Sequence, residues 1–277
     1  MAEHSTPAGD FVDHAVVGAL PVNRIGIDDL TAALRAGVDD FRAMPMHLLP
    51  LMLIYVVAGL IAMRWAMGND LLPLLFPLVS GFALVGPIAA VALYELSKRR
   101  EANGHISWVD APTRFREAAG VLKSPAIGTI ALLSMMLLVL LGLWLWSASM
   151  LYAALFDIAE PASLSGFVND VVATPEGWKL IVYGNAIGFG FAVVVLAGSA
   201  VSFPLALDRH VGFGVAVATS VAVFRKNPVT MLAWGAVVAG LLVLGALPML
   251  VGLALVLPVL GHATWHLYRR AVPRAAV

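Results

Sequence analysis

Long apolar stretches constrain this chain more than any other feature of its sequence. A helix that crosses a bilayer needs about 20 mostly apolar residues, because the hydrocarbon layer is about 30 Å thick and a helix rises about 1.5 Å per residue. The stretches that meet this requirement are 46–66, 71–95, 126–150, 179–206, 229–247 and 249–267. The sequence therefore predicts an all-α, polytopic membrane helical bundle with six transmembrane helices.

The composition agrees with a membrane protein and excludes several functions. Only 12% of the 277 residues are charged, against about a quarter in soluble domains. The net charge is zero, so no broad electrostatic field favours nucleic acid as a partner. The chain has no cysteine, which excludes disulfides, thiolate nucleophiles and cysteine-ligated metals.

Basic residues predict the orientation of the spans. All of the 17 Lys and Arg residues except Arg64 and Lys179 fall on one side of the predicted bundle. Because Lys and Arg are retained in the cytoplasm, both termini are expected to be cytoplasmic. We therefore predict a multi-pass protein of a bacterial inner (cytoplasmic) membrane, with short outer turns after the first and fifth spans.

Three amphipathic stretches suggest an internal repeat. Each precedes an odd-numbered span and ends in proline, at 28–45, 109–125 and 215–228. Apolar residues recur at helical spacing in them, as in Leu30, Leu34, Val38 and Phe41, or Phe213, Val217, Val221 and Phe224. This pattern is typical of helices that lie in the membrane interface, although the same stripes could pack on the spans instead. The sequence thus predicts three hairpin units with cytoplasmic in-plane helices.

The predicted organisation is a single membrane domain with two short tails. The domain covers 28–270 and its repeat units are about 28–100, 105–209 and 212–270. Residues 1–27 and 271–277 are predicted cytoplasmic tails. The outer loop between the third and fourth spans contains an apolar stripe from Leu164 to Val172, with Ser163 and Thr174 as N-caps and Pro175 in the first turn of the next helix. We expect a short helix on the outer face.

The membrane interior has few polar groups. Charged residues in mid-membrane are costly and usually functional, and none lies in the central part of a predicted span. Asn185, Ser199 and Ser202 could line a polar path, but such groups more often bond to a neighbouring helix. The small residues of GNAIG (184–188) favour close helix packing. No charged cluster for ion coupling is predicted.

The last apolar stretch contains two histidines at helical spacing. His262 and His266 are four residues apart and could share a face of a helix, as a metal site requires. A closed site needs three or four ligands, so we favour an interfacial anchor with the neighbouring aromatic and basic residues. We predict no metal and no cofactor. An intramembrane serine protease, with Ser199 as the nucleophile and His262 as its base, is disfavoured by the sequence around these residues.

The predicted cytoplasmic ends of spans two, four and six carry a second candidate cluster. Glu95 and Asp208 could pair with neighbouring arginines, and ordinary interfacial salt bridges are the favoured interpretation. The other members of this cluster, besides the two histidines, are Arg99, Arg100, Arg209 and Arg269.

Several stretches resemble a known family. They are LLPLLFPLVSGFALVGP (71–87), VGPIAAVALYELSKRRE (85–101), SFPLALDRHVG (202–212), TSVAVFRKNP (219–228) and LPVLGHATWHLYR (257–269). These resemble an uncharacterised family of proteobacterial inner-membrane proteins, domain of unknown function family 2189, over about residues 20–270. The resemblance implies a six-span inner-membrane protein and brings no activity, cofactor or catalytic residue.

These observations favour a non-enzymatic role. A membrane body without a catalytic constellation is typical of a scaffold, an assembly factor or an accessory subunit, whose partners are the lipid bilayer and other membrane proteins. The alternative is a channel or transporter for a neutral or lipidic solute, with a path around Asn185, Ser199 and Ser202. A transporter should contain a polar-lined cavity, whereas a scaffold should be filled.

Overall fold

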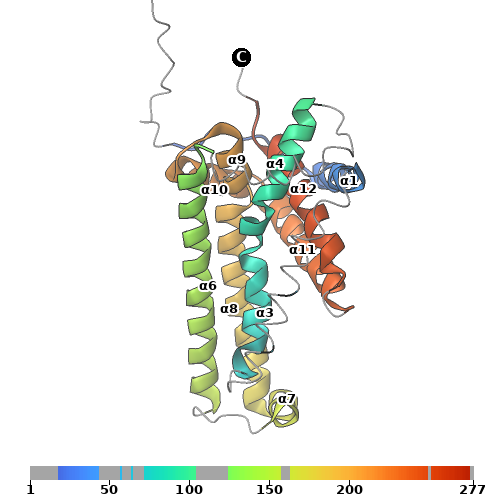
Figure 1. Cartoon of the computed structure of the whole chain (residues 1–277). Helices are drawn as coiled ribbons and strands as arrows, with labels where there is room; N and C mark the ends of the chain where they lie inside the picture. Colours follow the sequence, from blue (N-terminus) through green and yellow to red (C-terminus); the bar gives the residue numbers. More distant parts are fainter. Residues whose placement is uncertain are drawn as a thin grey trace, which may run out of the picture.

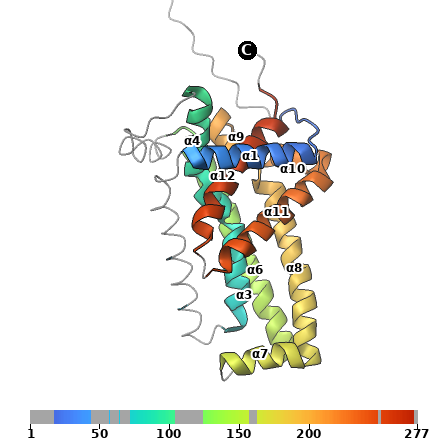
Figure 2. The ribbon, with the colours of Figure 1, turned by 90° about the vertical axis from the view of Figure 1, so that its right-hand side faces the viewer.

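The part of the chain that the structure describes is helical. The computed structural model describes residues 18–43, 57, 64, 72–103, 124–156, 163–248 and 251–274. These residues form helices joined by turns, with no strand among them. Long helices run side by side and shorter ones lie across the two ends of the bundle (Figures 1 and 2). The predicted all-α class is confirmed.

The described residues form eleven helical elements. In chain order they are α1 (Ile27–Ala43), η1 (Leu72–Leu74), α3 (Leu75–Leu84), α4 (Gly86–Asn103), α6 (Ile127–Phe156), α7 (Leu164–Ala173), α8 (Pro175–Ser199), α9 (Ser202–Arg209), α10 (Phe213–Lys226), α11 (Pro228–Ala246) and α12 (Leu253–Ala271).

Four helical stretches are long and apolar enough to cross a membrane. They are Leu75–Ala102, Ile127–Phe156, Pro175–Arg209 and Pro228–Ala246. They correspond to the predicted second, third, fourth and fifth spans, so the described residues confirm a multi-pass membrane protein. The predicted span 46–66 lies outside the described residues, apart from residues 57 and 64.

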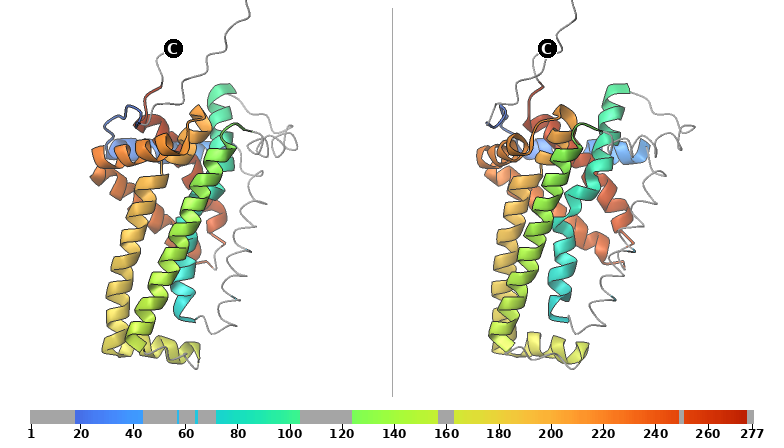
Figure 3. Two further views of the ribbon diagram at one scale, coloured as in Figure 1. Left: turned by 90° about the vertical axis from the view of Figure 1, so that its left-hand side faces the viewer. Right: turned by 60° about the vertical axis from the view of Figure 1, so that its left-hand side comes forward.

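The third hairpin is shorter than predicted. The adjoining ends of α11 and α12 lie level with the middle of α6, whereas α6 and α8 continue as far as α7 (Figures 1 and 3). The predicted span 249–267 corresponds to α12, which is not among the four candidate spans. An apolar composition indicates how long a helix can be, but packing against neighbours sets its tilt and depth.

The described residues at the end of this hairpin are apolar, and the N–H groups of Leu247 and Val251 are hydrogen-bonded. Leu247 is 74% exposed and Val251 is 65% exposed. The Leu247 N–H donates to the Val243 carbonyl, and the Val251 N–H donates to the Pro248 carbonyl. Because its exposed side chains are apolar, this end suits lipid rather than a water-filled passage.

Helices α1 and α10 lie across the end of the bundle opposite α7 (Figures 2 and 3). We call this end the in-plane end. The prediction of transverse helices at 28–45 and 215–228 is therefore confirmed, and α10 stops at Lys226 before Asn227 and Pro228 open α11. Of the second predicted stretch, 109–125, the structure describes only residues 124 and 125.

The face that α1 packs against the bundle differs from the predicted apolar stripe. Its buried residues are Leu30, Ala33, Gly37 and Asp40. Helix α10 behaves in the same way, with Ala216, Thr219, Ser220 and Val223 buried. Small residues let the helices approach closely. Apart from Leu30, the larger apolar residues of both predicted stripes therefore lie beside the packed face of their helix. They are only half-buried.

Helix α12 is held tightly between α1 and α4. A Cβ atom built on Gly37 of α1 would lie 2.7 Å from Ala263 Cβ. A Cβ atom built on Gly261 would lie 2.2 Å from the Leu93 side chain of α4. Real Cβ contacts are longer, so both glycines are needed for this packing. The close approach places the histidines of α12 next to α1.

Helix α7 lies across the opposite end and begins as predicted. The Ser163 side chain accepts from the Gly166 N–H at 3.1 Å, and the Thr174 side chain accepts from the Gly177 N–H at 3.0 Å. Pro175 is the first residue of α8. Both N-caps are confirmed, and they set the corner between α7 and α8.

Candidate functional site

A buried polar cluster joins α1, α4 and α12 at the in-plane end. We call it the Asp40 cluster, and its members are Asp40, Ser97, Arg100, His262 and His266. The Ser97 hydroxyl lies 2.6 Å from Asp40 Oδ2 and 2.7 Å from His262 Nδ1. His266 Nε2 lies 2.9 Å from Asp40 Oδ2, and the Arg100 guanidinium donates to Asp40 Oδ1. Asp40 thus ties α1 to both other helices.

The surroundings of Asp40 favour its charged form. Burial raises the pKa of Asp40, but this effect is outweighed by hydrogen bonds from His266 and Ser97 and by the electrostatic effect of His262 and His266, which lower the pKa. The pKa of Asp40 therefore lies below its ordinary value of 3.8. A buried carboxylate is tolerated when it is paired and hydrogen-bonded in this way.

The centre of the Asp40 cluster is closed to solvent, whereas the side chains of Arg100 and His266 at its edge are 28% and 23% exposed. His262 is 0% exposed and Ser97 is 1% exposed. His262 Nε2 has no hydrogen-bond partner among the described residues. A serine nucleophile needs a base within reach and access for substrate, and Ser97 lies between two partners with no exposed surface. This geometry favours a structural role, in which the cluster holds α1, α4 and α12 together, over a catalytic role.

A metal ion does not suit these donors. His266 and Asp40 are at hydrogen-bond distance, and Arg100 already occupies the second carboxylate oxygen. A zinc ion would need its ligands about 2.0–2.2 Å from a shared centre. Among the described residues, no group of three His, Cys, Asp or Glu side chains has the geometry of a metal site. The two histidines instead bond to protein partners.

A second polar cluster lies beside the first, where α4, α9 and α12 end. Asp208 accepts from the Tyr268 hydroxyl at 2.6 Å and from Arg269 at 3.0 Å. Glu101 accepts from Arg269 at 3.2 Å and from the indole N–H of Trp265 at 3.1 Å. These bonds close the end of the bundle with pairs of opposite charge.

The structure brings the predicted residues of the in-plane end together, and both predicted acidic residues pair with arginines. Glu95 pairs with Arg99 at 2.6 Å. Asp208 pairs with Arg269 rather than with Arg209, whose guanidinium donates to the Pro273 carbonyl. Arg100 belongs to the Asp40 cluster. The predicted residues are thus divided between a pair within α4 and contacts between helices.

The predicted polar path is not assembled in the described residues. Asn185 lies on the exposed side of α8. Ser199 is buried and donates to the Val195 carbonyl at 2.7 Å. Ser202 is buried and donates to the carbonyls of Gly198 and Ala216. The hydroxyls are therefore used within the backbone network and do not line a passage with Asn185.

Sequence analysis missed Asp40 and Ser97. Asp40 had a detectable signal, because it follows Leu30, Ala33 and Gly37 at helical spacing and so shares their face. A carboxylate on a face of small and apolar residues indicates a buried partner. Ser97 gave no such signal, since a serine beside a charged helix end is common.

An asparagine that precedes a proline holds the N-terminal segment in place. The Asn227 side chain accepts from the Ile25 N–H at 2.9 Å and donates to the Asn23 carbonyl at 3.0 Å. Lys226 donates to the Val22 carbonyl at 2.6 Å. Part of the predicted tail 1–27 is thus bound along α10 and the start of α11.

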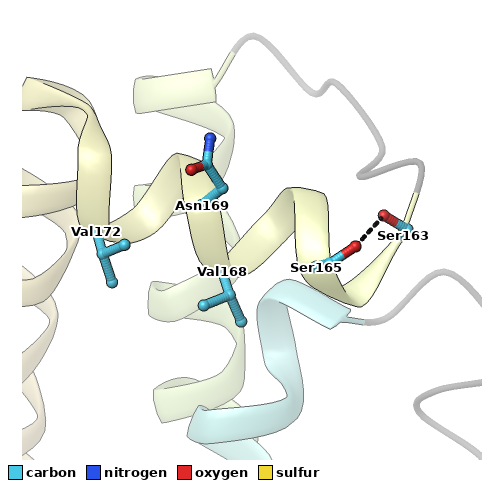
Figure 4. A pocket seen from close by; sticks show the side chains of 5 residues that line it. All are labelled: Ser163, Ser165, Val168, Asn169 and Val172. Carbon is cyan, nitrogen blue, oxygen red and sulfur yellow. Dashed lines mark hydrogen bonds between the residues drawn. The ribbon is translucent and has the colours of Figure 1, made fainter.

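The far end of the bundle has a hollow on α7. Its lining comes from one helix, and the hydroxyls of Ser163 and Ser165 lie 3.1 Å apart within it. The lining residues are Ser163, Ser165, Val168, Asn169 and Val172 (Figure 4). Ser163 is already the N-cap of α7, and no titratable group lies in this set, so the hollow carries no recognisable chemistry.

Comparison with known proteins gives a family without an assigned activity. The sequence profile of a family described as "Predicted integral membrane protein (DUF2189)" matches residues 75–208. This range contains three candidate spans, α3–α4, α6 and α8–α9, and it confirms the family resemblance for these residues. No curated protein and no solved structure matches the chain.

Proposed function

We propose that this chain, whose residues 75–208 match the profile of a family of predicted integral membrane proteins, acts as a non-enzymatic scaffold or accessory subunit. It would bind other membrane-embedded protein through the outward face of α8. The observation that carries this proposal is how little of α8 the rest of the chain covers. Only 6% of the apolar window of Pro175–Arg209 is buried, against 22–24% in the other three candidate spans.

The interior supports the same conclusion. The polar clusters at the in-plane end are internally paired, and the hydroxyls of Ser199 and Ser202 bond to backbone carbonyls. Neither arrangement leaves a polar surface for a solute. Recognition is therefore expected on the outside of the bundle, within the plane of the membrane, where packing and polar contacts drive association.

The experiment that tests this proposal measures how much protein surrounds the chain in its native membrane. The full chain would be extracted with its surrounding lipid into polymer nanodiscs, and the protein mass of each particle would be determined. The proposal predicts more protein than the 29.2 kDa of one chain. Particles with a single chain and no other protein, together with solute flux in reconstituted liposomes, would replace this proposal with the transporter alternative.

A further inference from the structure

Four exposed residues form a seam along α8. They are Val182, Asn185, Phe189 and Ala192, and we call them the α8 stripe. Their spacing of three, four and three residues is that of the a and d positions of a heptad, which face a partner helix in coiled-coil packing. Val182 is 59% exposed and Phe189 is 64% exposed. The stripe thus has the spacing of a helix interface but no partner among the described helices.

The same seam is already used for packing one step further along α8. Leu196 continues the heptad spacing, and its Cδ2 lies 2.9 Å from a Cβ atom built on Gly235 of α11. Helix α11 crosses the part of α8 that is near α10 (Figure 2), and the hairpin ends level with the middle of α6. Because the hairpin is short, the α8 stripe is left without a neighbour among the described helices.

Asn185 gives this uncovered seam a polar centre. It is the only amide side chain in the four candidate spans. Its Nδ2 donates to the Ile181 carbonyl at 2.7 Å, and no described residue donates to its Oδ1. An amide on the lipid-facing side of a spanning helix promotes pairing with another helix, because lipid offers it no hydrogen bond.

The other small residues nearby do not compete for this role. Gly184 and Gly188 face α6, where Cβ atoms would lie 3.8 Å from Leu151 and 3.0 Å from Trp144. The predicted small-residue motif 184–188 therefore serves packing inside the bundle. The α8 stripe lies on a different side of the same helix, so the two interfaces are compatible.

We propose that a second copy of this chain covers the α8 stripe, in a parallel two-fold dimer. Both copies insert in the same orientation, so each Asn185 would lie at the same depth as its counterpart. An amide has both a donor and an acceptor and can therefore pair with itself. An interface in which one patch meets the same patch is what two-fold symmetry requires. This inference rests on the proposed function, since it names the partner.

The absence of cysteine from the natural sequence makes the test direct. Single variants Val182→Cys, Asn185→Cys and Phe189→Cys would be made in the full chain and oxidised in native membranes at low expression. Tyr183→Cys, Val194→Cys and Met135→Cys are matched controls, because these residues are also 54–59% exposed but lie off the stripe. A disulfide forms only when the Cα atoms come within about 7 Å.

The proposal predicts a homodimer band for the stripe variants and not for the controls. Asn185→Leu should also lower the association constant in reconstituted bilayers about threefold to tenfold, as the loss of one interhelical polar contact would. Equal cross-linking of stripe and control positions, or no homodimer at all, would overturn it. Links from the stripe only to a different protein would overturn the second copy but leave the proposed function standing.

Discussion

Gly37 of α1 and Ala263 of α12 approach so closely that a Cβ atom on Gly37 would lie 2.7 Å from Ala263 Cβ. This contact brings the buried face of α1 onto α12 and carries Asp40 to the two histidines. The closed in-plane end of the bundle depends on it. The consequences for stability can be measured in the detergent-purified protein.

Gly37→Leu should destabilise the protein by forcing α1 away from α12. Overpacking of a filled contact costs about 1–3 kcal/mol, and the nearest atoms here include the α12 backbone, which cannot move aside. Thermal unfolding would show a lower Tm. Gly142→Ala on α6 is the control, since nothing lies within 4 Å of its Cβ position. Equal behaviour of the two variants would show that α1 does not pack on α12 as described.

Asp40→Asn should loosen the same contact by removing a buried charge. The change would leave Arg100 and His266 without their carboxylate partner, and an unpaired buried charge or donor costs about 1–3 kcal/mol. The Arg100 side chain is 28% exposed, so water would recover part of this loss. Asp39→Asn, at the exposed neighbouring position, should have no effect on Tm. If Asp40→Asn had the same Tm as the wild type, Asp40 would not be needed to hold α1 against α4 and α12.

The lowered pKa of Asp40 predicts a pH dependence. A carboxyl group whose pKa is lower in the folded state than its ordinary 3.8 stabilises the fold at pH values above 3.8. This contribution is lost as the pH falls through the folded pKa. As the pH falls below 5, the free energy of unfolding of the wild type should therefore decline more steeply than that of Asp40→Asn. If the free energy of unfolding declined equally with falling pH in both proteins, Asp40 would not be paired in the folded state.

The helix ends and the spans could be predicted because their causes are local. Ser163, Thr174 and Pro175 act on residues within one turn, and four spans follow from apolar length alone. The partners of Asp40 could not be predicted, because they lie up to 226 residues away along the chain. The most apolar stripe of α1 also predicted the wrong packing face. The face that packs on α12 is set by the close approach at Gly37.

The depth of the third hairpin was also beyond sequence analysis. The residues of α11 meet the same length and composition criteria as a full span, yet their tilt depends on where α12 packs. The uncovered state of the α8 stripe follows from this depth. The sequence therefore could not predict this uncovered stripe, because it depends on α11 crossing only one part of α8 (Figure 2).

Asn227→Ala should release the N-terminal segment. The substitution removes the acceptor of the Ile25 N–H and the donor to the Asn23 carbonyl. Net hydrogen-bond losses of about 0.5–1.5 kcal/mol each should increase exchange of the Ile25 amide. Hydrogen exchange with mass spectrometry would detect the change over residues 20–26. Asn169→Ala on α7, which is exposed, is the control, and unchanged exchange in Asn227→Ala would contradict the assignment.

The short hairpin predicts an unusual depth for Val251. A spin label at Val251→Cys should lie near the centre of the bilayer, because the adjoining ends of α11 and α12 are level with the middle of α6 (Figure 3). A label at Val172→Cys on α7 should lie near the membrane surface. Depth measurement with paramagnetic quenchers separates the two positions. Equal shallow depths would indicate that α11 and α12 cross the membrane completely.

The central claim is that protein, and not lipid, covers the α8 stripe in the membrane. The most direct measurement is oxygen accessibility of spin labels at Phe189→Cys and Met135→Cys, which replace side chains that are 64% and 59% exposed in the single chain. Both residues lie within apolar candidate spans, α8 and α6, and oxygen is concentrated in the surrounding lipid. We expect low accessibility at residue 189 and high accessibility at residue 135. High accessibility at both positions would contradict the account.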